Sequence, residues 1–496
     1  SRGHSTVIRQ LREGPNLNKE AANESYQMKG RKQKIFDTSE TCPQKNRTAS
    51  EGYVGGQTFI GITENNAFSK DQSEYGMLEY ILSPLNLNKA YLKVRQNKGA
   101  GGVDKMEVES LQDYLVRDKE VLIQSILRGK YCPNPVRRVL IPKENGSKRQ
   151  LGIPTVVDRV IQQAIYQVLS PVYEPRFSEY SYGFRQKRNA HDALNKCREY
   201  ITKGYIHAVD MDLEKFFDTV NHSKLTEVLS KTIKDGRVIS LIHKYLNAGV
   251  MTEGRHEPSE QGVPQGGPLS PLLGNIMLNE LDRELERRGH KFVRYADDMV
   301  ILCKSKRSAE RTMKSIIPFI EGKLFLKVNR EKSKVSHVKD VKFLGYTFYV
   351  YKGEGRLRIH PKSVLKMKAK IRKLTSRSNG WGNKRRKEAL RQYIRGWVQY
   401  FKLADMKNLL QRIDMWYRRR LRMVIWKQWK RIRTKLANLI RLGIPKSKAW
   451  EWANTRKGYW HIANSFILSR SITTDRLRKA GYIFLSDYYR LVRVIY

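Results

Sequence analysis

The segment Phe292-Val-Arg-Tyr-Ala-Asp-Asp-Met-Val-Ile-Leu-Cys303 decides the fold class of this 496-residue chain. It holds two β-prone runs separated by Ala-Asp-Asp, which predicts a β-hairpin with Asp297 and Asp298 at its turn. Adjacent carboxylates repel each other, and a divalent cation would offset that repulsion. Mg²⁺ is the ion expected, because it prefers carboxylate and phosphate oxygens. A solvated Asp-Asp turn is the alternative for this segment taken alone.

A second acidic segment, Val209-Asp-Met-Asp-Leu-Glu-Lys-Phe-Phe-Asp218, begins as a strand and continues into a predicted helix. Because side chains alternate along a strand, Asp210 and Asp212 lie on the same face. Such a strand end is, by itself, more often a helix cap or an ion-pair partner. Two acidic segments in a very basic protein favour a two-metal site for phosphoryl transfer.

The charge of the chain is strongly positive and unevenly distributed. It has 96 Lys and Arg against 48 Asp and Glu, a net charge of +48, which indicates a nucleic-acid partner. Residues 361–496 hold 36 basic and 6 acidic residues, whereas residues 1–78 hold 11 and 9. The four cysteines are far apart and predict neither a zinc site nor a disulfide framework. No apolar run approaches the roughly 18 residues of a membrane span, so no membrane partner is expected.

Strands and helices are predicted in an order without regular βαβ repetition, which favours an α+β fold. The predicted strands are 138–142, 207–212, 292–295, 299–303 and 342–348. The predicted helices are 158–170, 189–202, 222–247, 270–288 and 307–323, and the chain beyond about 361 is almost wholly helical. Residues 1–76 lack such periodicity and are predicted to form a flexible extension of unknown function.

Two further segments could approach a phosphate-bearing ligand. Residues 141–154 read as a hairpin with Asn-Gly at its turn and basic residues on or beside it. Residues 262–271 hold three Gly and three Pro before an apolar helix, a composition that lets backbone approach a ligand closely. Solvated hairpin charges and an ordinary loop are the alternatives.

Tyr295-Ala-Asp-Asp298 and Asp212-Leu-Glu-Lys-Phe-Phe-Asp218 resemble two motifs of the reverse transcriptases, and within that family of the group II intron type. The resemblance implies that Asp212, Asp297 and Asp298 are the catalytic residues and that Asp212 and Asp297 ligate two Mg²⁺ ions, for which Mn²⁺ is a substitute. The carbonyl of Leu213 would complete one site and Asp298 would support it. Asp210 is the second choice for the first ligand.

The resemblance also implies residues that bind the incoming dNTP. Phe217 would lie beneath its sugar and exclude a 2′-hydroxyl, although either Phe216 or Phe217 is expected to be core. Gln265, in the Pro-Gln-Gly motif of residues 262–271, would contact the nucleotide or the template. Lys143 and Arg149 of the basic hairpin would clamp the triphosphate.

Three further motifs match the family's spacing and imply contacts with the primer and template. They are Ser181-Tyr-Gly-Phe-Arg185, Val328-Asn-Arg-Glu-Lys-Ser-Lys334 and Phe343-Leu-Gly-Tyr346, the last of which resembles the primer grip. The residues implied are Arg185, Arg188, Lys332, Lys334, Phe343, Leu344 and Gly345.

The basic C-terminal region interleaves aromatic residues with Arg and Lys, a pattern typical of nucleic-acid binding. Its segment Arg395-Gly-Trp-Val-Gln-Tyr-Phe401 resembles the signature of the group II intron maturase domain. Trp397, Tyr400 and Phe401 are expected on the buried face of one helix. The residues expected to contact RNA are Arg395, Arg418, Arg419, Arg420, Lys427 and Lys430.

The resemblance implies a right-hand polymerase with fingers and part of the palm (77–205), the palm with the catalytic motif (206–355) and a helical thumb or maturase domain (356–496). Its implied function is RNA-directed DNA synthesis, together with help in splicing and retromobility of the parent intron. The implied partners are group II intron RNA, an RNA template with a DNA primer, target DNA and dNTPs, in a ribonucleoprotein of the bacterial cytoplasm. The sequence stops at Tyr496 without a motif for an H-N-H nuclease, which predicts the endonuclease-lacking IIC-like class.

Two alternatives remain open. One is a maturase that has lost polymerisation and only binds RNA, against which the intact Asp212, Asp297, Asp298 and Gln265 argue. The other is a bacterial reverse transcriptase of another lineage, such as a diversity-generating, retron or defence-associated enzyme, against which the maturase-like segment argues.

Overall fold

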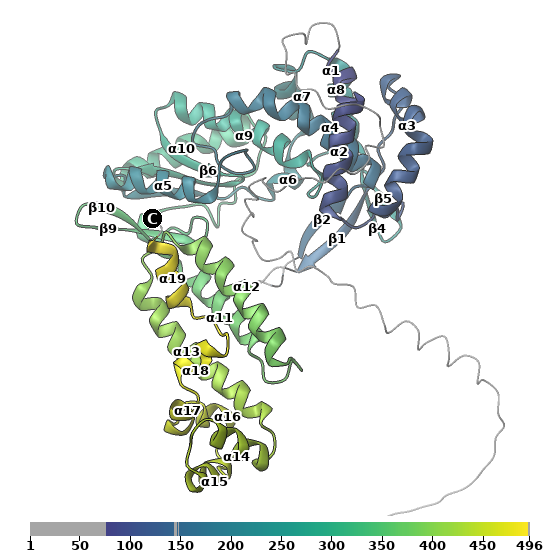
Figure 1. Cartoon of the computed structure of the whole chain (residues 1–496). Helices are drawn as coiled ribbons and strands as arrows, with labels where there is room; N and C mark the ends of the chain where they lie inside the picture. The colour runs from purple at the N-terminus through teal and green to yellow at the C-terminus, as the bar shows by residue number, and fades with distance from the viewer. Residues whose placement is uncertain (1–75, 143–145, 147, 495–496) are drawn as a thin grey trace, which may run out of the picture.

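The chain folds into one part that contains both helices and strands and a helical arm that extends from it (Figure 1). The computed structural model describes residues 76–142, 146 and 148–494. Lys143, Cys42 and nearly all of the predicted N-terminal extension lie outside these residues. The predicted α+β fold, followed by a helical region, is confirmed.

The fingers combine helices with a small sheet whose strand order is β2-β1-β4-β5. The predicted hairpin is confirmed, with Ile141 opposite Arg149 and Val139 opposite Leu151. Strands β4 and β5 were not predicted, and they join this sheet although they belong to the range predicted for the palm. The elements are α1 (Met77–Ile81), α2 (Pro84–Asn97), α3 (Leu111–Leu127), β1 (Val136–Pro142), β2 (Lys148–Ile153), α4 (Val156–Tyr173), β4 (Val250–Thr252) and β5 (Arg255–Glu257).

The palm is built on an antiparallel sheet with the strand order β6-β7-β3-β8. Its strands are β3 (His207–Met211), β6 (Lys291–Tyr295), β7 (Asp298–Cys303) and β8 (Lys334–His337). Tyr295 pairs with Asp298, which leaves Ala296 and Asp297 as the two turn residues of the predicted hairpin. Ala296 has φ +58°, the positive value that a two-residue hairpin turn requires at its first central position.

The two faces of the palm sheet belong to two different hydrophobic cores, as the period of two along a strand dictates. Met299 and Ile301 pack in one core with α9 and α10, whereas Val300 and Leu302 pack in the other with α5. The palm helices are α5 (Ala190–Thr202), α6 (Phe216–Thr219), α7 (His222–Ser230), α8 (Gly236–Asn247), α9 (Ser270–Arg287) and α10 (Lys306–Gly322).

Two details of the predicted palm are wrong. The helix expected over 222–247 is two helices, because Asp235 accepts a hydrogen bond from the Arg237 amide and starts α8 anew. The strand expected over 342–348 begins only at Tyr346, since Leu344 (φ +51°) and Gly345 (φ +81°) form a turn.

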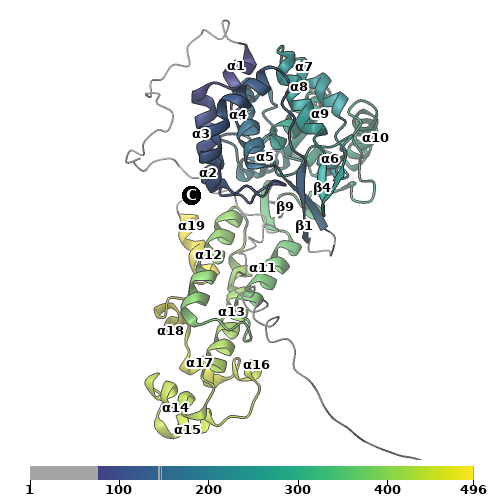
Figure 2. The same cartoon turned by 90° about the vertical axis from the view of Figure 1, so that its right-hand side faces the viewer.

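The C-terminal region carries its helices away from the palm, and α14 to α17 gather at the far end (Figure 2). Asp414 of α13 caps α19, accepting from the amides of Leu485 (3.0 Å) and Ser486 (2.8 Å). The elements are β9 (Tyr346–Tyr351), β10 (Glu354–Ile359), α11 (Pro361–Leu374), α12 (Asn383–Phe401), α13 (Lys407–Gln428), α14 (Ile432–Arg441), α15 (Lys446–Ala453), α16 (Tyr459–Ile462), α17 (Phe466–Ser471), α18 (Thr474–Lys479) and α19 (Leu485–Val494). Strand β10 crosses the predicted boundary between palm and thumb.

The base of α12 is tied to the palm by its aromatic residues. Phe401 is buried, while Trp397 and Tyr400 are half-buried and pack against the same core, so the predicted inward face is confirmed. The Tyr400 hydroxyl donates to the Leu344 carbonyl (2.9 Å), and its own carbonyl accepts from the His191 ring (2.7 Å). None of the helices among residues 76–142 and 148–494 has the length and apolarity to cross a bilayer.

Candidate active site and nucleic-acid surface

The two predicted acidic segments meet at one end of the palm sheet. Strands β3 and β7 pair so that Asp210 lies opposite Val300 and Met211 opposite Met299. The next positions along the two strands are Asp212 and Asp298, and Asp297 precedes Asp298 in the turn. The sequence separates these carboxylates by more than 80 residues, and strand pairing places them side by side.

The carboxylates influence one another electrostatically. Desolvation, followed by the charges of Asp297, Asp210 and Asp212, raises the pKa of Asp298 to about 6. Desolvation also raises the pKa of Asp210 to about 6, and Asp212 adds to this while Lys334 opposes it. A proton or cation bound at one of these carboxylates therefore changes the affinity of the others.

The donor atoms suit Mg²⁺, because hard carboxylate oxygens at a strongly acidic edge are what this ion prefers. The carboxylates are adjacent without converging on one point: within the described parts of the chain, no three Asp, Glu, His or Cys side chains form a group able to hold a metal ion. One Asp212 oxygen instead lies 3.2 Å from the ammonium of Lys332. The predicted ligand set, including the Leu213 carbonyl, remains a prediction.

The backbone of Asp212 is held by a residue that sequence reasoning missed. The Asp212 amide donates to the Ser333 hydroxyl (3.0 Å), which lies 3.3 Å from the Asp212 carbonyl oxygen, and the Asn329 amide donates to the same carbonyl (2.9 Å). The motif at 328–334 was noted only for its cations. Lys332 and Lys334 flank the carboxylates, since Lys334 pairs with Asp210 across β8 and β3.

Of Phe216 and Phe217, one belongs to the core and the other is a candidate contact for the nucleotide sugar. Phe216 is buried, so the expectation that one of the pair is core is confirmed. Phe217 is half-buried, and its ring packs edge-on at 5.0 Å from Phe216. A Cβ added at Gly274 of α9 would lie 3.2 Å from both rings, so this glycine makes room for them.

The Pro-Gln-Gly loop joins the palm to the fingers hairpin. The Gln265 carbonyl accepts from the Gly152 amide of β2 (2.7 Å), and its side-chain amide donates to Asp218 (3.1 Å). Gly266 has no room for a side chain, because a Cβ would lie 2.4 Å from the Gly152 oxygen. Arg149 is exposed on β2, next to this junction.

Arg185 was expected to contact the primer and template, whereas its guanidinium forms bonds inside the protein. Its guanidinium is buried, donates to the carbonyls of Ser178 and Ser181, and pairs with Glu174 through both the carboxylate (2.8 Å) and the backbone oxygen. With the bond from Nε to the Glu174 carboxylate (2.9 Å), every nitrogen of the guanidinium has an acceptor inside the protein. Arg188 also donates to a backbone carbonyl, that of Glu179, but its side chain is only half-buried.

The segment predicted as the primer grip is a turn whose backbone is held from the thumb side. The Ser363 hydroxyl donates to the Gly345 carbonyl (2.9 Å), next to the bond from Tyr400 to Leu344. Phe343 is buried at 3% exposure, so its side chain belongs to the core, and its predicted part in the primer grip stays a prediction. Leu344 is half-buried beside the acidic edge.

The predicted thumb cations play two different parts. Arg395 and Lys430 are exposed. Arg420 donates to Thr375 and to the Arg372 carbonyl, and Arg419 donates to the Trp460 carbonyl. These two guanidinium groups therefore join helices within the thumb.

Arg418 and Lys427 are half-buried on the same helix, α13. The Lys427 ammonium lies 5.8 Å from the ring centre of Tyr459, in a cation–π contact. Both cations stay candidates for RNA contact.

Known proteins match the two parts of this chain. Residues 141–348 match the family "Reverse transcriptase (RNA-dependent DNA polymerase)", and residues 364–441 match "Group II intron, maturase-specific domain". Protein YkfC of Escherichia coli is 35% identical over 54% of this chain and 82% of its own length. The group II intron-encoded protein LtrA of Lactococcus lactis subsp. cremoris is 30% identical over 63% of this chain and 62% of its own length. With its acidic strand ends in one palm and its helical domain behind them, the chain belongs to the group II intron reverse transcriptase/maturase family.

Proposed function

We propose that this protein copies RNA into DNA at the acidic edge of its palm and binds the intron RNA that encodes it, assisting splicing and retromobility. The observation that supports the polymerase site is the register of β3 and β7, which makes Asp212 and Asp298 neighbours. The maturase-specific domain supports the intron as the RNA partner. We place the complex in the cytoplasm as a ribonucleoprotein; the IIC-like subclass stays a prediction.

In this proposal Asp212, Asp297 and Asp298 hold the metal ions, together with the Leu213 carbonyl. When bound, two Mg²⁺ ions activate the primer 3′-hydroxyl and neutralise charge on the leaving pyrophosphate. Lys332 stands 3.2 Å from Asp212 and supplies positive charge next to the triphosphate.

The nucleotide would lie between the acidic edge and the fingers hairpin. Arg149 attracts its phosphates, and Lys143 is proposed for the same role. The loop at Gln265, fixed to β2 through its backbone, positions the base pair. Phe217 supports the sugar, with its ring braced by Phe216.

The proposed function predicts metal-dependent copying of RNA and a single kind of structured RNA partner. The purified protein is expected to extend a DNA primer on an RNA template with dNTPs and Mg²⁺, and to stop when EDTA removes the metal. Sequencing of RNA that co-purifies from the native host is expected to return one group II intron. Extension that persists in EDTA would contradict the metal site, and co-purification of unrelated RNAs would contradict the maturase role.

Phe217→Ala is expected to weaken selection against ribonucleotides by about 10- to 100-fold, because it removes the ring that would meet a 2′-hydroxyl. Single-nucleotide insertion with dCTP and CTP measures this ratio. Phe217→Tyr keeps the ring and is the matched control, expected to discriminate as well as the wild type. An unchanged ratio in Phe217→Ala would show that another residue selects the sugar.

A further inference from the structure

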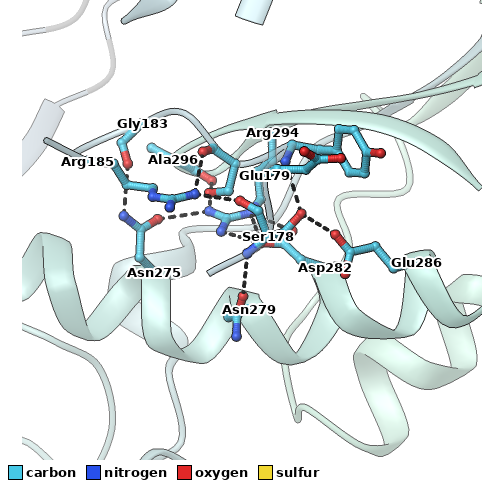
Figure 3. A network of polar contacts seen from close by, with 12 residues as sticks. Ser178, Glu179, Gly183, Arg185, Asn275, Asn279, Asp282, Glu286, Arg294 and Ala296 are labelled. Atoms are coloured by element: carbon cyan, nitrogen blue, oxygen red, sulfur yellow. Dashed lines mark hydrogen bonds and ion pairs between the residues drawn. The ribbon is translucent and has the colours of Figure 1, made fainter. Parts of the chain in front are cut away.

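The turn that carries the acidic pair rests on a buried ion pair on the opposite side of the sheet. Arg294 of β6 and Asp282 of α9 are 1% and 0% exposed, and their side chains meet through three contacts of 2.6 to 3.0 Å. Arg294 points to the face opposite Asp298, so it cannot touch a nucleotide bound at the acidic edge. Figure 3 shows Arg294 between Asp282, Asn275 and Ala296. None of the chemistry proposed above uses its charge.

The remaining donors of Arg294 reach the turn. One terminal nitrogen, Nη1, donates to the Ala296 carbonyl (2.9 Å) and to the side-chain oxygen of Asn275 (2.9 Å). Ala296 is the left-handed residue of the turn, a conformation that is unfavourable for a residue with a Cβ. The guanidinium therefore holds the peptide immediately before Asp297.

The segment 178–185 also packs against the turn. The side-chain amide of Asn275 donates to the Gly183 carbonyl (2.8 Å), and a Cβ at Gly183 would lie 2.3 Å from the Ala296 nitrogen. This segment also pairs with β6, since the Tyr182 amide donates to the Arg294 carbonyl (2.9 Å). Phe184, which follows Gly183 in the chain, lines an open cleft with Arg159 and Gly267.

From these contacts we infer that Arg294 and Asn275 are positioning residues, which fix the Ala296-Asp297 turn and so limit where the Asp297 carboxylate can lie when metal binds. Asp282 orients the planar guanidinium, and Asn275 joins it to Gly183, so the turn and the cleft-lining segment form one rigid unit. Groups that orient metal ligands in this way commonly change metal affinity about 10- to 100-fold when replaced. This inference rests on the proposed two-metal site.

The same helix offers a matched pair of asparagines. Asn275 and Asn279 are both buried on α9, and each accepts one hydrogen bond and donates one. Asn279 bonds to the Ser178 amide and the Arg176 carbonyl and does not contact the turn. Replacing either by alanine removes the same groups, and only one of them acts on Ala296.

The test is Mn²⁺ binding to the full chain with a primed RNA template, measured by electron paramagnetic resonance, alongside Mg²⁺ titration of primer extension. Asn275→Ala is expected to raise both half-saturating metal concentrations about tenfold or more, and Asn279→Ala to change them less than twofold. Arg294→Lys keeps the charge but lacks the planar fork, and it is expected to behave like Asn275→Ala. Melting temperatures of all three variants report folding.

Equal shifts in Asn275→Ala and Asn279→Ala, or no shift in a folded Asn275→Ala, would overturn the positioning role. The proposed metal site fails separately, when wild type and Asp297→Asn bind Mn²⁺ equally. In that case the asparagine pair is irrelevant to metal binding.

Discussion

We expect Asp297→Ala to reduce primer extension on an RNA template by at least about 10³-fold, because metal ions supply several kcal/mol of transition-state stabilisation. Binding of intron RNA is expected to stay within about twofold of the wild type, since the basic thumb is untouched. The measurements are single-turnover extension and filter binding of the same preparation.

Two further observations make this result specific to the metal site. Asp297 raises the pKa of Asp298, so its removal relieves repulsion and the melting temperature is expected to stay the same or rise. Asp340→Ala removes an exposed palm carboxylate away from the sheet end and is expected to extend primers normally. If Asp297→Ala lost RNA binding and synthesis in equal measure, the two activities would share one site.

The second large effect concerns salt. Binding of structured RNA is expected to weaken by about 10³-fold or more between 50 and 200 mM monovalent salt, the response typical of six or more neutralised phosphates. The net charge of +48, with 36 basic residues in 361–496, is the reason. A nearly flat dependence would remove the basic thumb as the binding surface.

Individual cations refine this prediction. Lys430→Ala and Arg395→Ala are each expected to lower the salt slope by about one, because both side chains are exposed. Arg287 is exposed too, but it pairs with Glu284 at 2.7 Å, so Arg287→Ala is the matched control and is expected to leave the slope unchanged. Arg420→Ala is expected to destabilise the thumb instead, since it breaks contacts with Thr375.

The hairpin at 292–303 and the strand at 207–211 could be predicted from the sequence, because alternation along a strand is a local property. The predictions that were wrong concern the ends of elements, which depend on contacts with other residues of the fold. The helix over 222–247 divides where Asp235 caps its second half, and the strand at 342 starts late because the 344–345 turn is held by Ser363 and Tyr400.

The candidate site shows the same division. Family motifs indicated Asp212, Asp297 and Asp298 by residue type and spacing, yet Ser333 lies 121 residues from the Asp212 that it holds. Asn275, Asn279 and Asp282 recur at helical spacing among the apolar residues of one side of α9, a signal that could have identified a buried polar stripe. From the sequence alone, Arg185 and Arg294 cannot be distinguished from arginines that bind phosphate.

The sequence by itself determined the strands β3, β6 and β7, the acidic turn and the basic helical region, since each depends on periodicity or charge within a short window. Only the tertiary structure decided which charged side chains can face a ligand and which are paired inside the protein. The physical reason is that a buried guanidinium must find acceptors for its N–H groups wherever the fold brings them. For Arg294 these acceptors lie on α9 and in the turn itself, and no local pattern specifies that meeting.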